Sequence, residues 1–532
     1  MATEAEAPPR AASRAGRVGS ARWPRLPLAA WASIALATLF VAVTCWWLSR
    51  DSSVPVDDAA VHLGSAIDAY EALGAGHLLK ALTGAAPYPP LTFLVGALGV
   101  LVGGVGVAPA IIALNVVFVP LLALGCYQVG RLAFGPVAGL LAVIFALGSP
   151  MVVEEFHEFM LDAPEASMVA IAVWAILATE RFSRLGVSAL AGLAVGLGLL
   201  TKETFVFFVA GVALATAFRG GLRAWRGIAV FTAVALVVAL PWYVREFSIL
   251  DTLGGEALGS SSRVSTQIPG IAPPRLSLAN LEWYLWSFLN WQFFVPLCAF
   301  AAVGVGWTIA AFARRRQLQG VLPELAFGAF VSWAALTETY VHDPRYGIPI
   351  AVYAAVFAVG WITRLPRAAG ALAAAALALV VLANVLGVGF GVGETITSAP
   401  QNLTEVEQPG VLTVYANYGF WMGPPTRDGD TLGLLRTLRG EGVRYVALHA
   451  EKEPSIEFSP PGLELLARIA GLRVSSTTVD PANVGRSYAF LMHRRPEPGL
   501  PRPCVTLRDG TGVWIRLGGS SGPRAWSHCP RV

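Results

Sequence analysis

Two adjacent carboxylates, Asp57 and Asp58, form the sharpest chemical signal in the sequence, and His62 follows four residues after the second one. They come just after the first long apolar run and open a polar loop that closes on Tyr-Pro-Pro-Leu at 88–91. A carboxylate placed there could accept the proton of an attacking hydroxyl or amine, and His62 is a candidate substrate contact. The structural alternative is a solvated helix start, because Asp is a good N-cap and favours the first turn.

A second acidic cluster precedes the apolar run at 163–181. Its titratable members are Glu154, Glu155, His157, Glu158 and Asp162. Asp162 lies at the mouth of that run and is the candidate for a second catalytic or positioning carboxylate. The cluster could instead hold a divalent metal, with Glu155, His157 and Glu158 as weak ligand candidates, although their spacing is not diagnostic. A third interpretation is an acidic loop that is merely hydrated.

Two cations lie at comparable junctions between apolar runs. Lys202 could hold a phosphate as a point charge, or it could extend to the membrane interface and pair with its neighbour Glu203. Arg345 offers a planar fork suited to phosphate, or it could form an interfacial anchor with Tyr346. His342 and Tyr346 lie close to Arg345 in the sequence, and both are candidate substrate contacts.

The composition indicates a polytopic helical membrane protein. Of the 532 residues, 55% are hydrophobic and only 14% are charged, and the mean hydropathy is +0.60. Repeated apolar runs close to the ~20 residues that cross a bilayer exclude a soluble globular protein. The sequence contains neither G-x-G-x-x-G nor G-x-x-x-x-G-K-[ST], so a nucleotide-phosphate loop is not supported, and we expect no nucleic-acid partner.

The basic residues set the expected orientation in the cell membrane. Apolar runs occur at 26–48, 91–107, 109–130, 134–150, 163–181, 185–200, 203–218, 227–244, 290–312, 324–341, 346–363 and 368–391. The arginine-bearing junctions share one side with the basic N-terminal tail only if the short, Gly-rich run 91–107 does not cross. We therefore expect this run to be a juxtamembrane or re-entrant helix, with about eleven spans, a cytoplasmic N-terminus and an extracytoplasmic C-terminus. All the acidic and cationic junctions described above then face outward.

The chain divides into three expected parts. A cytoplasmic basic tail, 1–25, precedes a transmembrane domain, 26–391, and a polar C-terminal tail, 392–532, follows it. The outer loops of the transmembrane domain are 50–108, 150–162 and 245–289.

The tail 392–532 alternates strand-like and helical segments, which predicts a small α/β domain outside the membrane. Strands are expected at 411–415, 443–448 and 487–493, and helices at 432–439 and 463–470. In that location Cys504 and Cys529 could form a disulfide.

The order and sidedness of these motifs resemble the GT-C glycosyltransferases, in particular their protein O-mannosyltransferase and aminoarabinose-transferase-like branch. The resemblance covers about 26–391 and is carried by the acidic pair, Tyr-Pro-Pro-Leu, a second acidic loop ending Asp-x-Pro, Leu-Thr-Lys, Pro-Trp-Tyr and Arg-Tyr. It implies transfer of a sugar from a polyprenyl-phosphate carrier at the outer face, with inversion at the anomeric carbon. The implied partners are this lipid-linked donor and membrane lipids, while lipid, glycan and protein acceptors all stay open.

The resemblance also implies roles for individual residues. Asp57 takes the place of the catalytic or acceptor-orienting carboxylate, and Asp58 stands where the family often has Glu. Asp162 matches the Asp of the second loop. Lys202 and Arg345 are the candidates for binding the carrier phosphate.

Two features depart from the family pattern. His62 stands near a position where many relatives carry an aromatic residue, and the second loop is more acidic than usual, which keeps a divalent metal possible. Members of this branch commonly require no metal, because a phosphate-bearing lipid is already a leaving group that cations can stabilise.

Two other classes of protein compete with this interpretation. A lipid-linked sugar transporter or flippase would need charged residues near the middle of its spans, along a path. This sequence keeps them at the ends of its apolar runs. A non-catalytic membrane assembly protein would act through the tail 392–532.

Overall fold

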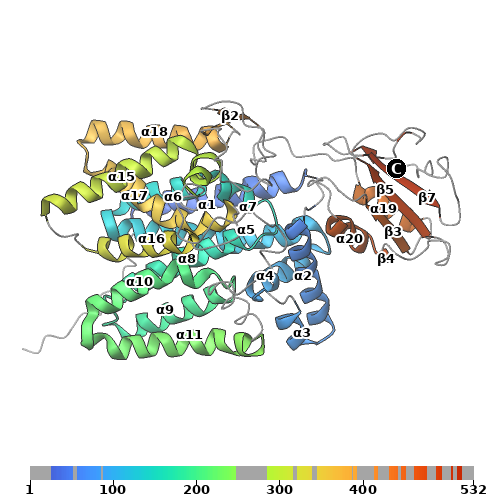
Figure 1. Cartoon of the computed structure of the whole chain (residues 1–532), viewed down its shortest axis with the longest axis horizontal. Coiled ribbons are helices and arrows are strands. Elements are labelled where there is room, and N and C mark those ends of the chain that lie inside the picture. The colour runs from blue at the N-terminus through green and yellow to red at the C-terminus, as the bar shows by residue number, and fades with distance from the viewer. Residues whose placement is uncertain are drawn as a thin grey trace, which may run out of the picture.

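The computed structural model of the chain is an elongated helical bundle that carries a small β-sheet at one end (Figure 1). The described residues are 26–51, 55, 57–84, 88–246, 284–315, 320–337, 344–385, 388–391, 413–416, 431–440, 445–450, 460–475, 487–493, 502, 505–506 and 512–517. Asp57 is described as part of a helix, without its side chain. His342, Cys504 and Cys529 lie outside the described residues.

The bundle consists of helices joined by short turns. In chain order they are α1 (Leu28–Leu48), α2 (Asp57–Gly74), α3 (Leu78–Thr83), α4 (Leu91–Gly103), α5 (Val107–Phe134), α6 (Pro136–Leu147), α7 (Pro150–Glu155), α8 (Asp162–Ala178), α9 (Leu185–Leu199), α10 (Phe205–Gly220), η1 (Gly221–Ala224), α11 (Trp225–Arg245), η2 (Phe288–Gln292), α15 (Phe294–Arg315), α16 (Leu322–Thr337), η3 (Pro344–Ile350), α17 (Ala351–Gly360), η4 (Ile362–Arg364) and α18 (Arg367–Val385). A helix lies at every apolar run that the sequence contains.

Six helical stretches of the described chain are long and apolar enough to cross a membrane, judged by length and composition. Four shorter apolar helices, α4, α6, α9 and α16, lie among them. Small residues allow close helix packing: a Cβ on Gly125 of α5 would lie 2.5 Å from the backbone of Ala170 in α8. The expected helical membrane architecture is confirmed, whereas the count of about eleven spans stays a prediction.

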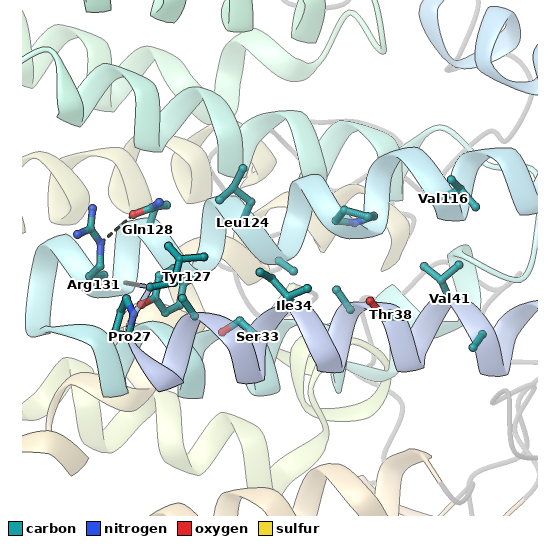
Figure 2. Close-up of a pocket in the computed structure, with 16 residues that line it drawn as sticks. Pro27, Ser33, Ile34, Thr38, Val41, Val116, Leu124, Tyr127, Gln128 and Arg131 are labelled. Atoms are coloured by element: carbon teal, nitrogen blue, oxygen red, sulfur yellow. Dashed lines mark hydrogen bonds between the residues drawn. The ribbon is translucent and has the colours of Figure 1, made fainter. Parts of the chain in front are cut away.

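One end of the bundle, which we call the arginine end, gathers basic junctions. Pro27, just before α1, lies beside Arg131 near the end of α5 (Figure 2). Arg219 at the end of α10 donates to Glu324 at the start of α16 over 2.6 Å. The opposite end, which we call the site end, holds the junction between α9 and α10, where the Leu200 carbonyl accepts from the backbone of α4. This separation is the pattern from which the orientation was predicted, and the assignment of the arginine end to the cytoplasm stays a prediction.

Helix α4 begins and ends at the site end. The N–H of its first residue, Leu91, donates to the Leu200 carbonyl over 2.8 Å. Its last residue, Gly103, packs against Pro109 at the start of α5, and α5 ends at the arginine end. With 13 residues α4 is about 20 Å long, shorter than the ~30 Å hydrocarbon core. These features support the expected juxtamembrane helix at 91–107.

The first outer loop is largely helical, because it contains α2 and α3 in addition to α4. Ala59, Leu63, Ala66 and Ile67 of α2 are buried, and their spacing places them on one face of that helix. This face packs against α4, where a Cβ on Gly96 would lie 2.9 Å from Ala66. The loop therefore forms a packed layer over the site end rather than an open connection.

The C-terminal tail contains a five-stranded sheet in the order β4-β3-β5-β7-β6. Its elements are α19 (Thr431–Gly440), β3 (Tyr445–Ala450), α20 (Pro460–Ile469), β4 (Arg473–Ser475), β5 (Ser487–His493), β6 (Val505–Thr506) and β7 (Gly512–Leu517). Strand β3 is parallel to β4 and β5, with Tyr445 opposite both Arg473 and Ser487. Parallel pairing needs a crossover, which α20 supplies between β3 and β4.

Strands and helices occur near each position expected in the tail, but β4, β6 and β7 were not predicted, and the first expected strand lies outside the five-stranded sheet. The first expected strand corresponds to β2 (Thr413–Ala416), which pairs antiparallel with β1 (Val388–Gly391) in a separate two-stranded ribbon. A domain boundary at residue 392 and a location outside the membrane stay predictions.

The tail contacts the bundle through an arginine on α20. Arg468 Nη2 donates to Asp68 over 2.6 Å and to Glu71 over 2.8 Å. These two carboxylates lie three residues apart on one face of α2. Because α2 begins at Asp57 and Asp58, the contact ties the tail to the helix that carries the acidic pair.

We expect Arg468→Ala to release the tail from α2. Partly exposed ion pairs contribute only ~0.2–1 kcal/mol each, so the thermal transition of the bundle should stay unchanged while added protease separates the tail faster. Limited proteolysis of the purified protein measures this, with Arg436→Ala, an exposed arginine on α19, as the matched control. Equal cleavage rates for the wild type and Arg468→Ala would contradict the contact.

Candidate active site

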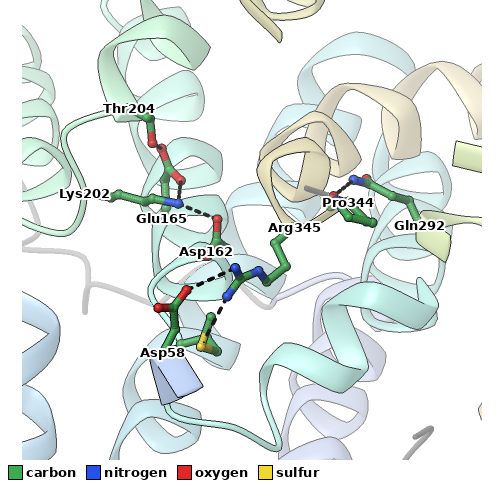
Figure 3. A network of polar contacts seen from close by, with 9 residues as sticks. Asp58, Asp162, Glu165, Lys202, Thr204, Gln292, Pro344 and Arg345 are labelled. Carbon is green, nitrogen blue, oxygen red and sulfur yellow. Dashed lines mark hydrogen bonds and ion pairs between the residues drawn. The ribbon is translucent and has the colours of Figure 1, made fainter. Parts of the chain in front are cut away.

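Four charged side chains gather at the site end of the bundle (Figure 3). Asp58 comes from the first turn of α2, Asp162 from the start of α8, Lys202 from the turn between α9 and α10, and Arg345 from η3. Asp58 and Arg345 are 287 residues apart in the sequence. All four were singled out from the sequence, and the fold brings them together.

Arg345 and Asp58 form a half-exposed ion pair. Nη2 of Arg345 lies 3.1 Å from Oδ2 of Asp58, and Nη1 lies 3.8 Å from the sulfur of Met160. The Asp58 side chain is 49% exposed and the Arg345 side chain 23%. Such a pair contributes little to stability. The guanidinium fork matches phosphate as well as carboxylate, so it can exchange one partner for the other.

The segment that carries Arg345 is fixed from η2. The side-chain amide of Gln292 donates to the carbonyl of Pro344, directly before Arg345. Gly347 lies so close to Gln292 that any Cβ at this position would overlap the amide. The backbone on both sides of Arg345 is therefore held in place by Gln292.

Lys202 is buried and is held by two carboxylates. Its Nζ lies 2.6 Å from Oδ1 of Asp162 and 4.0 Å from Oε2 of Glu165, and it lies 4.7 Å from the ring centre of Tyr346. Thr204 donates to the other oxygen of Glu165 over 2.7 Å. Burial alone would lower the pKa of Lys202, but the Asp162 and Glu165 carboxylates raise it well above its ordinary value. Lys202 is therefore a permanent cation in a site of low exposure.

The turn that carries Lys202 is anchored on both sides. The Tyr243 hydroxyl on α11 donates to the Leu199 carbonyl over 2.9 Å, and the Leu91 N–H donates to the Leu200 carbonyl over 2.8 Å. Two of the short sequence motifs, Tyr-Pro-Pro-Leu and Pro-Trp-Tyr, thus supply the groups that position Leu-Thr-Lys. The three motifs therefore meet at one turn of the folded chain.

His62 lies one turn after Asp58, buried between aromatic rings. It packs edge-on against Tyr88 at 5.0 Å and tilted against Phe93 at 5.9 Å. Its Nδ1 has no hydrogen-bond partner among the described residues. Burial lowers the pKa of His62 to about 4, although the Asp58 carboxylate opposes the shift. His62 is thus neutral at physiological pH and behaves as part of an aromatic wall.

This burial predicts a pH-dependent stability. The unfolded chain takes up a proton at His62 near pH 6.5, while the folded protein resists protonation down to about pH 4. The free energy of unfolding should therefore fall by about 3 kcal/mol as the pH drops from 6.5 to 4. Thermal melts of the wild type and His62→Phe across this range measure the difference. A constant difference between the two proteins would contradict the neutral, buried imidazole.

The members of the acidic cluster of the second loop have different surroundings in the structure. Glu155 is buried, and burial together with Asp162 raises its pKa well above the usual range. The His157 ring stacks on Trp47 at 4.4 Å, and burial lowers its pKa to about 3. The Glu158 side chain is exposed. Within the described residues no three His, Cys, Asp or Glu side chains are grouped to hold a metal, so no step of the chemistry is assigned to one.

Comparison with known proteins identifies the architecture. Residues 87–244 match the family model described as dolichyl-phosphate-mannose-protein mannosyltransferase. The crystal structure of ArnT from Cupriavidus metallidurans in the apo state superposes with a TM-score of 0.54 at 16% identity, over 92% of this chain and 100% of that one. The chain has the GT-C fold. The resemblance inferred from the sequence is thereby confirmed.

A second ArnT structure from the same organism, bound to undecaprenyl phosphate, superposes with a TM-score of 0.55 at 14% identity, over 92% of this chain and 99% of that one. A search of curated proteins finds no match to the sequence. Together the family model and the GT-C fold support a membrane glycosyltransferase activity, without distinguishing hexosyl from pentosyl transfer.

In this GT-C chain two polar residues of the site were missed by the sequence interpretation, Glu165 and Thr204. Glu165 lies three residues after Asp162, on the same face of α8, and this spacing was a usable signal. The Tyr346 ring lies beside the Lys202 cation, and its role as a substrate contact stays a prediction. The roles proposed for Asp57 and His342 stay predictions, because the structure describes neither side chain.

Proposed function

We propose that the chain is a membrane glycosyltransferase that moves a sugar from a polyprenyl-phosphate donor to an acceptor at the site end, which faces away from the cytoplasm. The observation that carries the proposal is that a partly exposed Arg345 and a buried Lys202 lie at the same end of a membrane bundle. Undecaprenyl phosphate bound to an ArnT of the same fold supports a lipid phosphate as the ligand.

Arg345 is the proposed partner of the carrier phosphate. Its Nη2 contacts one oxygen of Asp58, and the phosphodiester of the donor carries the same single negative charge with two oxygens that can accept from the guanidinium. Exchange of Asp58 for phosphate costs little, because the pair is partly exposed. Asp58 therefore orients the guanidinium until the phosphate binds, and it does not react itself.

Asp57 is the proposed proton acceptor, as the family resemblance implies. In the reaction the acceptor oxygen or nitrogen attacks the anomeric carbon, and its proton passes to the Asp57 carboxylate. The bond from that carbon to the phosphate oxygen breaks, and the polyprenyl phosphate leaves as an anion. A single displacement of this kind inverts the anomeric carbon.

Lys202 and Asp162 are proposed to shape the site electrostatically. A fixed cation in a site of low exposure stabilises developing negative charge more strongly than one in water. Asp162 and Glu165 hold Lys202 in place, so no reorganisation is needed when charge develops on the leaving phosphate. The cations thereby supply the charge stabilisation that a metal would otherwise supply.

Sugar release from a panel of labelled donors tests this proposal. Membranes containing the protein are given polyprenyl-phosphate sugars in one series and nucleotide sugars in the other. We expect loss of label from one or more lipid-linked donors and from no nucleotide sugar. Label released only from nucleotide sugars would overturn the proposal, and intact donor moved across the vesicle wall without cleavage would instead identify a flippase.

A further inference from the structure

A long apolar groove runs between α1 and α5, away from the catalytic cluster (Figure 2). Its volume is about 810 Å³. On α1 it follows one face from Pro27 to Val41, and on α5 it follows the stripe from Val116 to Arg131. Fifteen residues of helix span about 22 Å, whereas one leaflet of the hydrocarbon core is about 15 Å deep. The groove can therefore take an extended hydrocarbon chain along the full depth of a leaflet.

The polar end of the groove lies at the arginine end of the bundle. Tyr127 lines the groove and is only 5% exposed, and its hydroxyl has no hydrogen-bond partner among the described residues. A buried hydroxyl without a partner costs ~1–3 kcal/mol. This oxygen is enclosed by the protein, so Tyr127 offers the groove its ring and not its hydroxyl.

One turn further along α5, Arg131 adds a positive charge on the same stripe. Its Nε donates to Oε1 of Gln128 over 2.8 Å, which fixes the plane of the guanidinium. No bond within the described part of the chain involves its two terminal nitrogens. A fork fixed at one edge, with the other edge open, suits a phosphate group.

We propose that this groove binds one anionic phospholipid of the leaflet at the arginine end, with an acyl chain between α1 and α5. The phosphate lies against the Arg131 fork, and the acyl chain continues over the Tyr127 ring. A neutral lipid is disfavoured because Arg131 selects for net negative charge, as basic residues at membrane interfaces do. The site is independent of the proposed transferase chemistry.

The lipid should also hold α1 in place. About half of the surface of Trp31, Ile34 and Leu39 is exposed in the protein alone, and α1 precedes the helix that carries Asp57 and Asp58. A chain in the groove adds apolar contacts on the side of α1 that faces α5. Loss of the lipid is therefore expected to loosen the first helix before the rest of the bundle.

The test measures lipid retained by the purified full chain. Protein is reconstituted with phosphatidylglycerol or with phosphatidylcholine of identical acyl chains, and bound lipid is counted by native mass spectrometry. We expect at least tenfold tighter retention of phosphatidylglycerol, lost in Arg131→Gln. Arg223→Gln, an exposed arginine at the same end, is the matched control and should behave as the wild type.

A second variant tests the groove itself. Thr38 lines the groove from an exposed position, so Thr38→Trp fills the groove without disturbing the core, and retention of either lipid should fall. Equal retention of the two lipids by the wild type would overturn the proposal. Retention of phosphatidylglycerol by Arg131→Gln at the wild-type level would overturn it too. Retention of undecaprenyl phosphate in place of phosphatidylglycerol would show that the occupant is the wrong lipid.

Discussion

Lys202→Met is expected to abolish detectable sugar transfer and to lower the melting temperature of the protein. The substitution leaves Asp162 and Glu165 buried without their cation. Removing one partner of a buried ion pair costs ~3–5 kcal/mol, because the remaining charge has lost its solvation and its counter-charge. Transfer rate and thermal unfolding in the same detergent measure the two effects.

A double variant separates the loss of function from the loss of stability. Lys202→Met with Asp162→Asn removes both charges of the closest pair, while Glu165 keeps its bond from Thr204. Its melting temperature should recover much of the loss, because the carboxylate closest to the missing cation is neutralised and only Glu165, which lies 4.0 Å away, still lacks its counter-charge, but transfer should stay undetectable. Recovery of transfer in the double variant would show that Lys202 serves stability alone.

Asp57→Asn is expected to lower kcat by about 10²–10⁴-fold, the usual range for loss of a general base. Asp58→Asn should act differently, because Asp58 orients Arg345. Its main effect should be a higher KM for the lipid-linked donor with a smaller change in kcat. The free energy of unfolding of Asp58→Asn should change by no more than ~1 kcal/mol, since the Asp58 pair is half exposed.

Asp57→Asn and Asp58→Asn serve as controls for each other. Both substitutions remove one charge from the same helical turn, so a general electrostatic effect would lower kcat equally in both. A large fall in kcat for Asp58→Asn with normal turnover for Asp57→Asn would reverse the assigned roles. Steady-state rates over a series of donor concentrations distinguish these outcomes.

Much of the bundle could be predicted from the sequence because a membrane leaves few alternatives. Every apolar run became a helix, since backbone groups in lipid must be satisfied within the segment. The arginines of neighbouring junctions predict that the short run 91–107 does not cross the membrane. Helix α2 was harder, because its polar face hides the spacing of Ala59, Leu63, Ala66 and Ile67, which becomes clear only when the helical period is counted.

The residues of the candidate site could be predicted from the sequence, but the ion pairs that they form could not. Charge at the ends of apolar runs marked Asp58, Asp162, Lys202 and Arg345, but no sequence pattern shows that Arg345 meets Asp58 while Lys202 meets Asp162. Those contacts depend on how α2 and η3 pack at the site end. The metal interpretation of the second loop treated neighbours in sequence as neighbours in space, whereas the His157 ring turns away to stack on Trp47.

In the tail, local secondary structure could be predicted, but strand pairing and contacts with the bundle could not. Its strand–helix order was readable from apolar periodicity, whereas the pairing of β2 with β1 depends on a strand that directly follows α18. Likewise, the contact of Arg468 with α2 joins residues 400 positions apart. Long-range contacts between exposed charges leave no periodic trace in a sequence.

Binding of undecaprenyl phosphate, with undecaprenol as the comparison ligand, tests most directly whether the charged cluster at the site end holds a lipid phosphate. The wild type should bind the phosphate form at least tenfold more tightly, because charge-assisted hydrogen bonds from Arg345 contribute ~1.5–3 kcal/mol. Arg345→Gln should lose this preference, while Arg223→Gln at the arginine end should keep it. Equal affinity of the wild type for the phosphate and the alcohol would contradict the proposed donor and the role of the site.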